Sequence, residues 1–169
     1  QCMDQSSRGE VVNSGRMIIL SNRLPITVDW TNEEPEIQPS AGGLVTALGP
    51  ILREAGSCWV GWTGTDYTPL LSDLLSEWCV THNYSLHPIY MSAAEKDRFY
   101  NGGSNQVIWP LFHGLHSRCR FDSAYWLAYQ RGNQKFPDAV DAIWRSGDFV
   151  WVQDYHLMLA GEALRQNGF

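Results

Sequence analysis

Polar side chains follow two strongly apolar runs at the points where those runs end. Asn22 and Arg23 come after the first run, and Asp154 and His156 come after the last. If both runs are parallel strands of one sheet, their carboxyl ends lie at the same edge, where open α/β sheets bind ligands. Taken singly, Arg23 is also compatible with a solvated loop and Asp154 with a helix N-cap. Together on one rim, the four residues predict a ligand site.

A second candidate is the pair Gly42-Gly43, which stands directly before a predicted helix. Glycine lets a phosphate approach the backbone, and a helix start offers free N–H groups and the positive end of the helix dipole. The pair is not part of a GxGxxG motif and does not follow a strand immediately, so a nicotinamide cofactor is not expected. The sequence has no P-loop lysine either. On its own the pair is a weak signal, because glycine pairs are common in turns.

A third candidate is the aromatic and polar stretch FYNGGSN at 99–105, followed by WPLFH at 109–113. Aromatic faces such as those of Tyr100 and Trp109 suit the C–H faces of a sugar ring, and the polar side chains can hydrogen-bond its hydroxyls. A plain arrangement of core and turn explains these residues equally well on physical grounds alone.

The segments that would hold these residues alternate between strand and helix patterns. Strands are predicted at four places, of which the first, second and last are buried: 17–20, 58–62, 84–91 and 149–152. Pro88 limits the third to an edge or a bulge. Helices are predicted at five places: 44–52, 70–78, 93–100, 123–144 and 157–164. The alternation predicts an α/β fold, a Rossmann-like parallel sheet with flanking helices.

Single residues predict where these segments begin, end or weaken. Ser92 opens a capping box with Glu95, Ser123 is a candidate cap, and Gly56 ends the first helix. Asp29–Pro39 is predicted to be a surface loop. Kinks, breaks or weak points in the helices are predicted at a few residues: Pro50, the pair Gly102-Gly103, Gly132 and Pro137.

Composition excludes several classes of protein. The net charge of −6 argues against a nucleic-acid partner, since phosphate backbones are met by clustered Lys and Arg. No apolar run approaches the length of a membrane span, and no secretory signal opens the chain. The four cysteines lack the spacing of a zinc site, so we expect reduced thiols, no metal and a cytoplasmic protein. Residues 1–15 are polar and aperiodic, which predicts a disordered lead-in to one domain over 16–169.

Six motifs occur in the order and spacing of the trehalose-6-phosphate synthase family (glycosyltransferase family 20), which the sequence resembles over roughly residues 16–169. They are SNRLP at 21–25, SAGGL at 40–44, WVGW at 59–62, FYN with SN within 99–105, WP with FH within 109–113, and DYHL at 154–157. Six ordered motifs are much more specific than any one of them. The resemblance implies a retaining glucosyltransferase of the GT-B type, with two Rossmann-like domains, that moves glucose from UDP-glucose to glucose 6-phosphate without a metal or other cofactor.

The resemblance also implies roles for particular residues. Arg23 would clamp the acceptor phosphate, a task that suits a guanidinium fork. Gly43, next to Gly42, would place its backbone N–H against the nucleotide diphosphate. Asp154 would bind sugar hydroxyls near the reacting centre and is the candidate catalytic residue. Three aromatic residues would line the acceptor sugar pocket: Trp62, Tyr100 and Trp109.

The sequence departs from the family pattern at a few positions. Gly103 stands where many members have Phe, which predicts an opened wall beside Tyr100, and Gln153 stands where His is frequent. Gly132 and Pro137 fall in a helix that the family usually keeps smooth. These departures affect the expected shape of the acceptor pocket and local stability more than the class of reaction.

We expect the chain to be an incomplete N-terminal, acceptor-binding domain, since the family's nucleotide-sugar domain has no counterpart here. The 169 residues alone are therefore expected to have no meaningful turnover. Three alternatives remain open. They are a glucosylglycerol-phosphate synthase that uses glycerol 3-phosphate as acceptor, a non-catalytic regulatory subunit that senses sugar phosphates, and an isolated domain that binds the acceptor weakly. A homo-oligomer is compatible with each of these readings.

Overall fold

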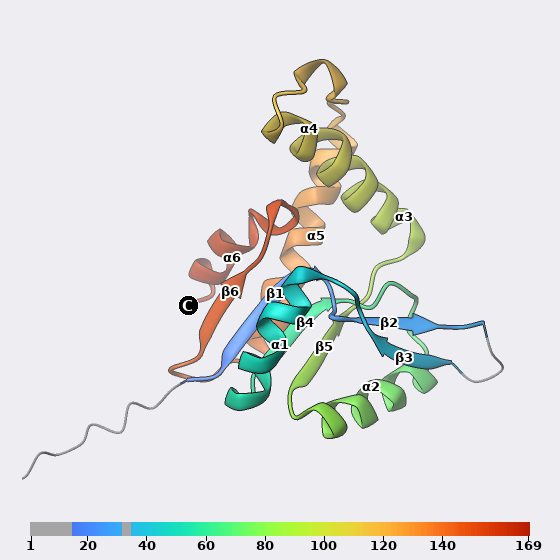
Figure 1. Cartoon of the computed structure of the whole chain (residues 1–169). Coiled ribbons are helices and arrows are strands. Elements are labelled where there is room, and N and C mark those ends of the chain that lie inside the picture. Colours follow the sequence, from blue (N-terminus) through green and yellow to red (C-terminus); the bar gives the residue numbers. More distant parts are fainter. Residues whose placement is uncertain (1–14, 32–34) are drawn as a thin grey trace, which may run out of the picture.

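The computed structural model describes residues 15–31 and 35–169. The predicted disordered lead-in, residues 1–15, therefore lies outside the described part of the chain except for its last residue. Within that part, the chain forms a four-stranded parallel sheet and a separate two-stranded hairpin (Figure 1).

The parallel sheet has the order β5-β4-β1-β6. Its strands are β1 (Met17–Arg23), β4 (Cys58–Trp62), β5 (Ser85–Ile89) and β6 (Phe149–Val152). β1 lies in the middle, where Ile19 pairs with Trp59 on one side and with Trp151 on the other. Such a central strand is buried on both faces, which explains the unbroken apolar run that opens the described chain.

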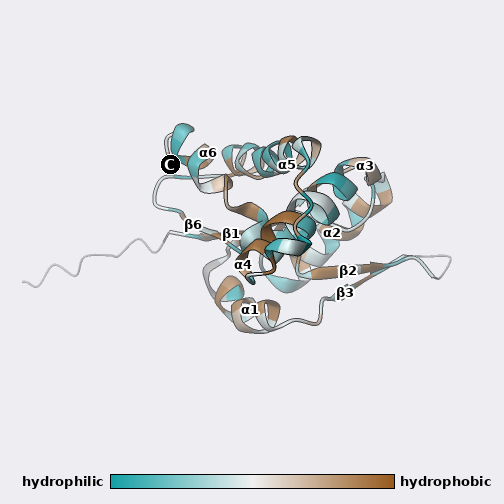
Figure 2. Ribbon diagram, turned by 90° about the horizontal axis from the view of Figure 1, so that it is seen from above, coloured by the Kyte–Doolittle hydropathy of each residue, from teal (hydrophilic) through white to brown (hydrophobic). Residues whose placement is uncertain are grey.

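Helices cover both faces of this sheet (Figures 1 and 2). Ile19 and Trp59 point into a core shared with α1 (Gly43–Ala55) and α2 (Pro69–His82). Ile18 and Leu20 point the other way, into a core shared with α5 (Ser123–Asp141) and α6 (Ala160–Gln166). Because side chains alternate along a strand, one apolar segment supplies both cores.

The two outer strands differ from each other. β5 is an edge strand that contains Pro88, as predicted. β6 was predicted to be buried, and this is wrong: it is the other edge, and Phe149 and Trp151 are 59% and 40% exposed. Its apolar composition is that of a strand covered on both sides, but among the described residues only one of its edges is paired.

The predicted surface loop at Asp29–Pro39 is also wrong at its ends. β2 (Ile26–Asp29) and β3 (Glu36–Pro39) pair in an antiparallel hairpin, with Val28 opposite Ile37. The acidic and proline-rich composition masked the short strands, because only a few apolar residues pack against the core.

The Gly102-Gly103 pair does not break a helix. After the short α3 (Ala93–Lys96), whose Ser92–Glu95 capping box is confirmed, the chain continues as a π-helix, η1 (Asp97–Ile108), and then as α4 (Trp109–Phe112). A β-carbon on Gly102 would lie 2.5 Å from the Tyr125 ring, and one on Gly103 would lie 3.0 Å from the β-carbon of Tyr129. The two glycines therefore allow close contact with α5. The expected opening beside Tyr100 is not at Gly103, since that residue is buried under α5.

Helix α5 is continuous through Gly132 and Pro137, so neither residue interrupts it. Its cap is Asp122, whose Oδ1 accepts a hydrogen bond of 2.7 Å from the N–H of Ala124, and the predicted Ser123 is the first helical residue. The helix ends at Asp141, three residues before the predicted end. Gly132 is buried and faces the ring of Phe99 on η1.

The remaining helices differ from the predictions mainly at their ends. α1 continues for five residues beyond Pro50 and ends, as predicted, at Gly56 in the left-handed conformation. The last predicted helix is split into a 3₁₀ turn, η3 (Tyr155–Leu157), and α6. A further short 3₁₀ turn, η2 (His116–Arg118), follows α4.

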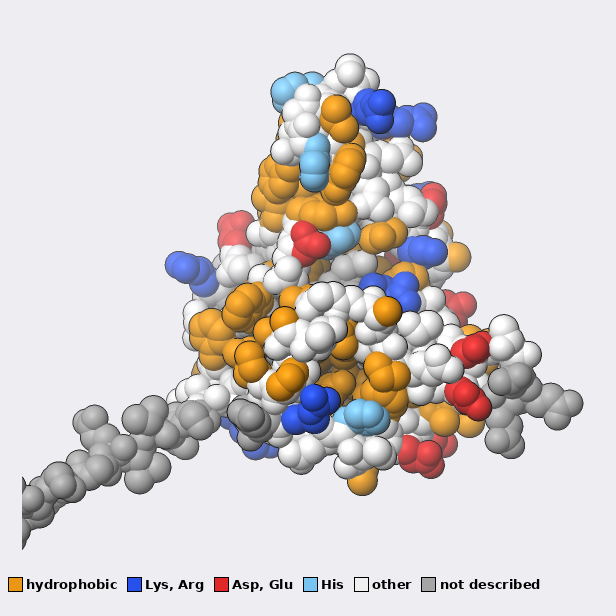
Figure 3. Space-filling model, viewed as in Figure 1, with side chains coloured by type: hydrophobic (Ala, Val, Ile, Leu, Met, Phe, Trp, Pro, Cys, Tyr) orange, Lys and Arg blue, Asp and Glu red, His pale blue; other side chains and the backbone are white. Residues whose placement is uncertain are grey.

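The sheet forms a broad base from which α4 and the adjoining ends of η1 and α5 project (Figures 1 and 3). Apolar side chains gather on the visible face of this projecting part (Figure 3). In the chain segment that forms it, Leu111, Phe112 and Phe121 are exposed. None of the helices in the described ranges combines the length and the apolar character that crossing a bilayer requires.

The contact between η1 and α5 generates the first prediction. A β-carbon on Gly132 would lie 2.4 Å from the Phe99 ring, and Phe99 is a buried core residue that is 1% exposed. We expect Gly132→Ala to lower the free energy of unfolding by about 1–3 kcal/mol through overpacking, even though alanine favours helix by about 1 kcal/mol. Urea denaturation measures the change.

The matched control is Gly161→Ala in α6, where an added β-carbon meets no atom within 4 Å. This variant should be neutral or more stable by up to about 1 kcal/mol. Equal stabilisation of both variants would show that η1 and α5 are not in the close contact described.

Candidate active site

A cavity of ≈ 440 Å³ lies at the carboxyl ends of β1 and β6, bounded by the start of α1 and by η1. The four rim residues that the sequence predicted, Asn22, Arg23, Asp154 and His156, all line it. Tyr100 of η1 lines it as well. The structure therefore brings together a guanidinium, a carboxylate and a flat aromatic face, the set of groups that suits a phosphorylated sugar.

Arg23 is the last residue of β1, and hydrogen bonds at the end of this strand hold its backbone in place. The Ser21 hydroxyl donates a 2.6 Å hydrogen bond to the Arg23 carbonyl and accepts one of 2.7 Å from the buried Trp59 indole N–H. The Leu24 N–H donates to the Trp62 carbonyl at 3.0 Å. The direction in which the Arg23 side chain leaves the sheet is thus fixed by buried hydrogen bonds.

The guanidinium of Arg23 lies over the ring of Trp62, with Cζ 4.9 Å from the ring centroid. Loss of surrounding water lowers the pKa of Arg23 from its usual value, although the side chain as a whole stays open to solvent. An arginine remains a cation at neutral pH under such a shift. A cation seated on an aromatic face and short of water is well prepared to bind an anion.

Two glycines make room for Arg23, and neither was predicted as a site residue. A β-carbon on Gly61 would lie 2.7 Å from the Arg23 backbone, and one on Gly64 would lie 2.3 Å from the guanidinium Nη2. Gly64 also has φ of +93°, a conformation that other residues rarely adopt. The sequence WVGWTG at 59–64 indicates this arrangement, since Gly61 and Gly64 flank Trp62, on which the guanidinium lies.

Asp154 stands directly after β6 in an unusual backbone conformation, with φ 75° and ψ 166°. Its Oδ1 accepts a 2.7 Å hydrogen bond from the Tyr155 N–H, so it also caps the short turn η3. Its other oxygen, Oδ2, lies 3.6 Å from His156 Nδ1. A non-glycine residue held in this region of backbone space is strained, and such strain clusters at functional sites.

His156 stacks between two tyrosine rings at the base of the cavity. Its ring centroid lies 5.4 Å from that of Tyr100 and 4.0 Å from that of Tyr155. Neither ring nitrogen of His156 has a hydrogen-bond partner within the described structure. Burial lowers the pKa of His156, and the nearby Asp154 carboxylate partly opposes this shift.

Helix α5 holds the turn that carries Asp154 and His156. The Tyr129 hydroxyl donates a 2.5 Å hydrogen bond to the Tyr155 carbonyl, and the Asn133 amide donates one of 3.0 Å to the His156 carbonyl. Asn133 Oδ1 also accepts from the Leu159 N–H at 3.1 Å. The sequence did not predict the roles of Tyr129 and Asn133, because the sequence of a helix does not show which distant backbone groups its polar side chains will contact.

Gly42 and Gly43 lie at the edge of the site. Gly43 is the first residue of α1, and the next two residues, Leu44 and Val45, line the cavity. A β-carbon on either glycine would meet no atom within 4 Å, so the space before the helix start is open. The N–H groups at a helix start have no partner within the helix, and an anion can bind them there.

Two predicted residues do not line the cavity. Trp62 is 6% exposed and lies beneath Arg23, and Lys96 approaches the same ring, with Nζ 5.5 Å from the centroid. Trp109 is 40% exposed on α4, where it stacks on His113 at 4.0 Å. Lys96 was missed by the sequence analysis, although it stands one helical turn before Tyr100.

Comparison with known proteins gives the family. Residues 15–168 match glycosyltransferase family 20. The chain belongs to this family. An alpha,alpha-trehalose-phosphate synthase (UDP-forming) from Schizosaccharomyces pombe is 38% identical over 167 residues, which are 96% of this chain and 32% of that protein. The chain thus spans between about a fifth and a third of the length of the curated relatives it matches.

Solved structures show the same fold. A structure from E. coli bound with UDP-2-fluoro glucose superposes with a TM-score of 0.69 at 26% identity, over 91% of this chain and 31% of that one. A UDP-forming alpha,alpha-trehalose-phosphate synthase from Burkholderia xenovorans in complex with glucose 6-phosphate superposes with a TM-score of 0.65 at 28% identity, over 91% and 31%. These similarities and the parallel sheet confirm the predicted family and fold class.

The buried histidine generates a prediction about pH. Since the folded state disfavours protonation of His156, the unfolded state binds more protons below the ordinary histidine pKa of about 6.5. The free energy of unfolding should therefore fall as the pH drops below about 6.5. His156→Phe keeps a flat ring between the tyrosines but cannot be protonated, so part of this pH dependence should disappear.

Urea denaturation of both proteins between about pH 5 and 8 measures this difference. His87, whose pKa burial also lowers, keeps its share of the pH dependence in the variant. An identical pH dependence in the two proteins would contradict the assignment of a neutral, buried His156.

Proposed function

We propose that this chain is the acceptor-binding, N-terminal part of a retaining glucosyltransferase. In this proposal the whole enzyme transfers glucose from UDP-glucose to glucose 6-phosphate and releases UDP and trehalose 6-phosphate. The observation that carries it is the cavity at the strand ends, which is lined by Arg23, Tyr100 and Asp154 together.

The acceptor side of the proposal rests on Arg23. A guanidinium can bind two phosphate oxygens at once, and its seat on Trp62 and against Gly64 holds the fork in place. Lys96 adds a second positive charge above the same tryptophan. Tyr100 offers its face to the sugar ring, and the relative from Burkholderia xenovorans has glucose 6-phosphate bound. A place for Trp109 in this pocket stays a prediction.

The donor side rests on the start of α1 and on Asp154. The open space at Gly42 and Gly43 leads to unpaired N–H groups that suit a diphosphate. Asp154 lines the same cavity, where a carboxylate can accept hydrogen bonds from sugar hydroxyls. The similar E. coli structure has a UDP-glucose analogue bound. Since the chain spans at most about a third of the length of these relatives, we assign the remaining donor contacts to residues outside it.

The proposed reaction replaces the bond between glucose C1 and the diphosphate oxygen by a bond from C1 to the acceptor hydroxyl oxygen. The acceptor proton passes to the departing diphosphate oxygen on the same face of the sugar, which retains the configuration and needs no enzymic nucleophile. Asp154 would orient the donor sugar hydroxyls and stabilise positive charge that develops at C1. Such a reaction takes place between two domains, so we expect no turnover by residues 1–169 alone. We place the whole enzyme in the cytoplasm.

Removal of the phosphate clamp tests the acceptor assignment. In the full-length enzyme, Arg23→Ala should weaken acceptor binding by about 2–3 kcal/mol, because charge-assisted hydrogen bonds to the acceptor phosphate are lost. This corresponds to a rise of at least about 30-fold in KM for glucose 6-phosphate. KM for UDP-glucose should change little. Initial rates of UDP release at varied acceptor and donor concentrations give both values.

The control is Arg53→Ala, which removes an exposed arginine in the last turn of α1, outside the cavity. It should leave both KM values unchanged. An unchanged KM for glucose 6-phosphate in Arg23→Ala would show that Arg23 is not the acceptor clamp.

The choice of acceptor is tested separately. Full-length protein with UDP-glucose should release UDP in the presence of glucose 6-phosphate and much more slowly with glycerol 3-phosphate, because the face of Tyr100 is suited to a sugar ring. A preference for glycerol 3-phosphate would favour a glucosylglycerol-phosphate synthase. Binding of glucose 6-phosphate without turnover would favour a regulatory subunit.

A further inference from the structure

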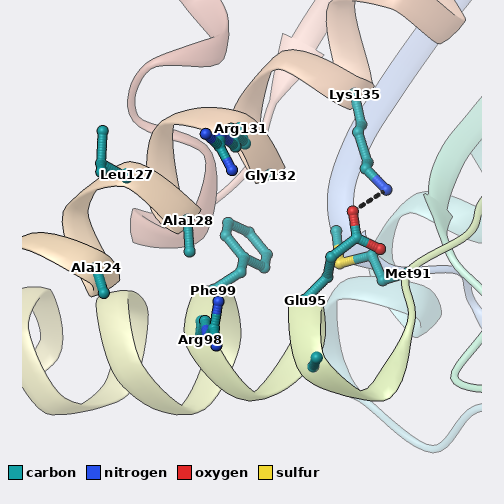
Figure 4. Close-up of a pocket in the computed structure, with 11 residues that line it drawn as sticks. Met91, Glu95, Arg98, Phe99, Ala124, Leu127, Ala128, Arg131, Gly132 and Lys135 are labelled. Atoms are coloured by element: carbon teal, nitrogen blue, oxygen red, sulfur yellow. Dashed lines mark ion pairs between the residues drawn. The ribbon is translucent and has the colours of Figure 1, made fainter.

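A second cavity, of ≈ 230 Å³, lies between η1 and α5 (Figure 4). One wall comes from α3 and η1 and carries Glu95, Arg98 and Phe99. The other wall comes from α5 and carries Ala124, Leu127, Ala128 and Arg131, with Lys135 at one end. It shares no lining residue with the cavity at the strand ends.

The charges of this second cavity are unbalanced. Lys135 forms an ion pair with Glu95 at 2.6 Å, so these two charges cancel each other. Arg98 and Arg131 lie on opposite walls, on either side of the Phe99 ring (Figure 4). Both arginines are exposed, and neither makes an ion pair or a side-chain hydrogen bond within residues 15–31 and 35–169. A chain with a net charge of −6 thus has a local excess of two positive charges here.

The shape of this cavity limits what can enter it. Its apolar base includes Phe99, Met91 and Gly132, where the two helices approach each other closely. Pockets for drug-sized molecules are about 300–1,000 Å³, so this one suits a more compact ligand. The Glu95–Lys135 pair at one end offers further polar contacts to hydroxyl groups.

We propose that this cavity binds a small organic phosphate ester. A phosphate monoester carries about two negative charges at neutral pH, which matches the two unpaired guanidinium groups. Each guanidinium can donate two parallel hydrogen bonds to a phosphate, which a single lysine cannot do. The organic part of the ligand packs against Leu127 and Ala128 on the α5 wall. This site is separate from the acceptor and donor sites assigned above.

The position of the cavity gives such a ligand a route to the reaction. Phe99, at its base, and Tyr100, on the wall of the acceptor cavity, are consecutive residues of η1. A ligand held between η1 and α5 therefore touches both the helix that presents Tyr100 and the helix that holds the Asp154 turn. We expect the site to act as an effector site and not as part of the reacting centre.

The test is a calorimetric titration of the full-length protein that carries Arg23→Ala, which weakens phosphate binding at the acceptor cavity. Glycerol 3-phosphate is the probe, with inorganic phosphate in a parallel titration. We expect binding of glycerol 3-phosphate that is lost or weakened about tenfold or more when Arg98→Ser and Arg131→Ser are added, because hydrogen bonds between charged groups are removed.

Two matched pairs of variants separate this site from general effects. Arg118→Ser with Arg120→Ser removes the same charge from exposed arginines outside the cavity and should leave the affinity unchanged. Ala124→Glu puts a negative charge at the cavity wall in the first turn of α5, where a carboxylate is compatible with the helix dipole, and should weaken binding. Ala124→Gln, of the same size without the charge, should have a smaller effect.

The titration is independent of turnover, so it remains informative if the proposed glucosyltransferase activity is absent. Absence of binding to the Arg23→Ala protein would overturn the proposal, and so would equal affinity in the Arg98→Ser, Arg131→Ser protein. Inorganic phosphate that binds as tightly as glycerol 3-phosphate would overturn the contribution assigned to the apolar α5 wall and thus the choice of an ester.

Discussion

The close approach of η1 and α5 is the constraint on which the functional part of the molecule depends. Three glycines, Gly102, Gly103 and Gly132, remove the side chains that would otherwise keep the two helices apart. This contact seats Phe99 in the core and turns the next residue, Tyr100, toward the cavity at the strand ends. Because protein interiors are close-packed, one added methyl group at such a contact must move a helix or a ring. The three glycines therefore help to position Tyr100, although none of them is its neighbour in the sequence.

The second requirement is that buried polar groups near the site find partners. Tyr129 and Asn133 project from α5 and form hydrogen bonds with backbone carbonyl and N–H groups of the segment that follows β6. An unpaired backbone carbonyl or N–H group in that place would lower the free energy of unfolding by about 1–3 kcal/mol. These hydrogen bonds therefore stabilise the backbone conformation of the turn. This stabilisation permits Asp154 to keep a strained backbone conformation, with its carboxylate beside the cavity. The helix layer thus acts on the site through backbone hydrogen bonds as well as through packing.

The sequence alone predicted most of the sheet and the rim of the site, and the reasons are local. Apolar runs followed by polar residues placed Arg23 and Asp154 at strand ends, and a parallel sheet places such ends together. What could not be predicted depends on contacts between distant segments. Local propensity alone indicates that glycines in η1 and α5 break these helices. In the structure, Gly102 and Gly132 instead leave room for the rings of Tyr125 and Phe99. In the same way, the composition of β6 indicates burial, whereas its position at the edge is set by topology.

Electrostatics completes the connection between sequence and function. The chain carries a net charge of −6, but the ligands assigned to it are anions, so long-range attraction cannot bring them in. Binding must rely on cations placed within a few ångströms of the bound anion, because the Coulomb attraction falls with distance. Arg23 on the Trp62 face and the two guanidinium groups across Phe99 meet this condition in different ways. In the first case the cation lies over an aromatic ring, and in the second two closely packed helices each contribute one cation to a shared cavity. Both arrangements depend on glycines at which an added β-carbon would collide with neighbouring atoms.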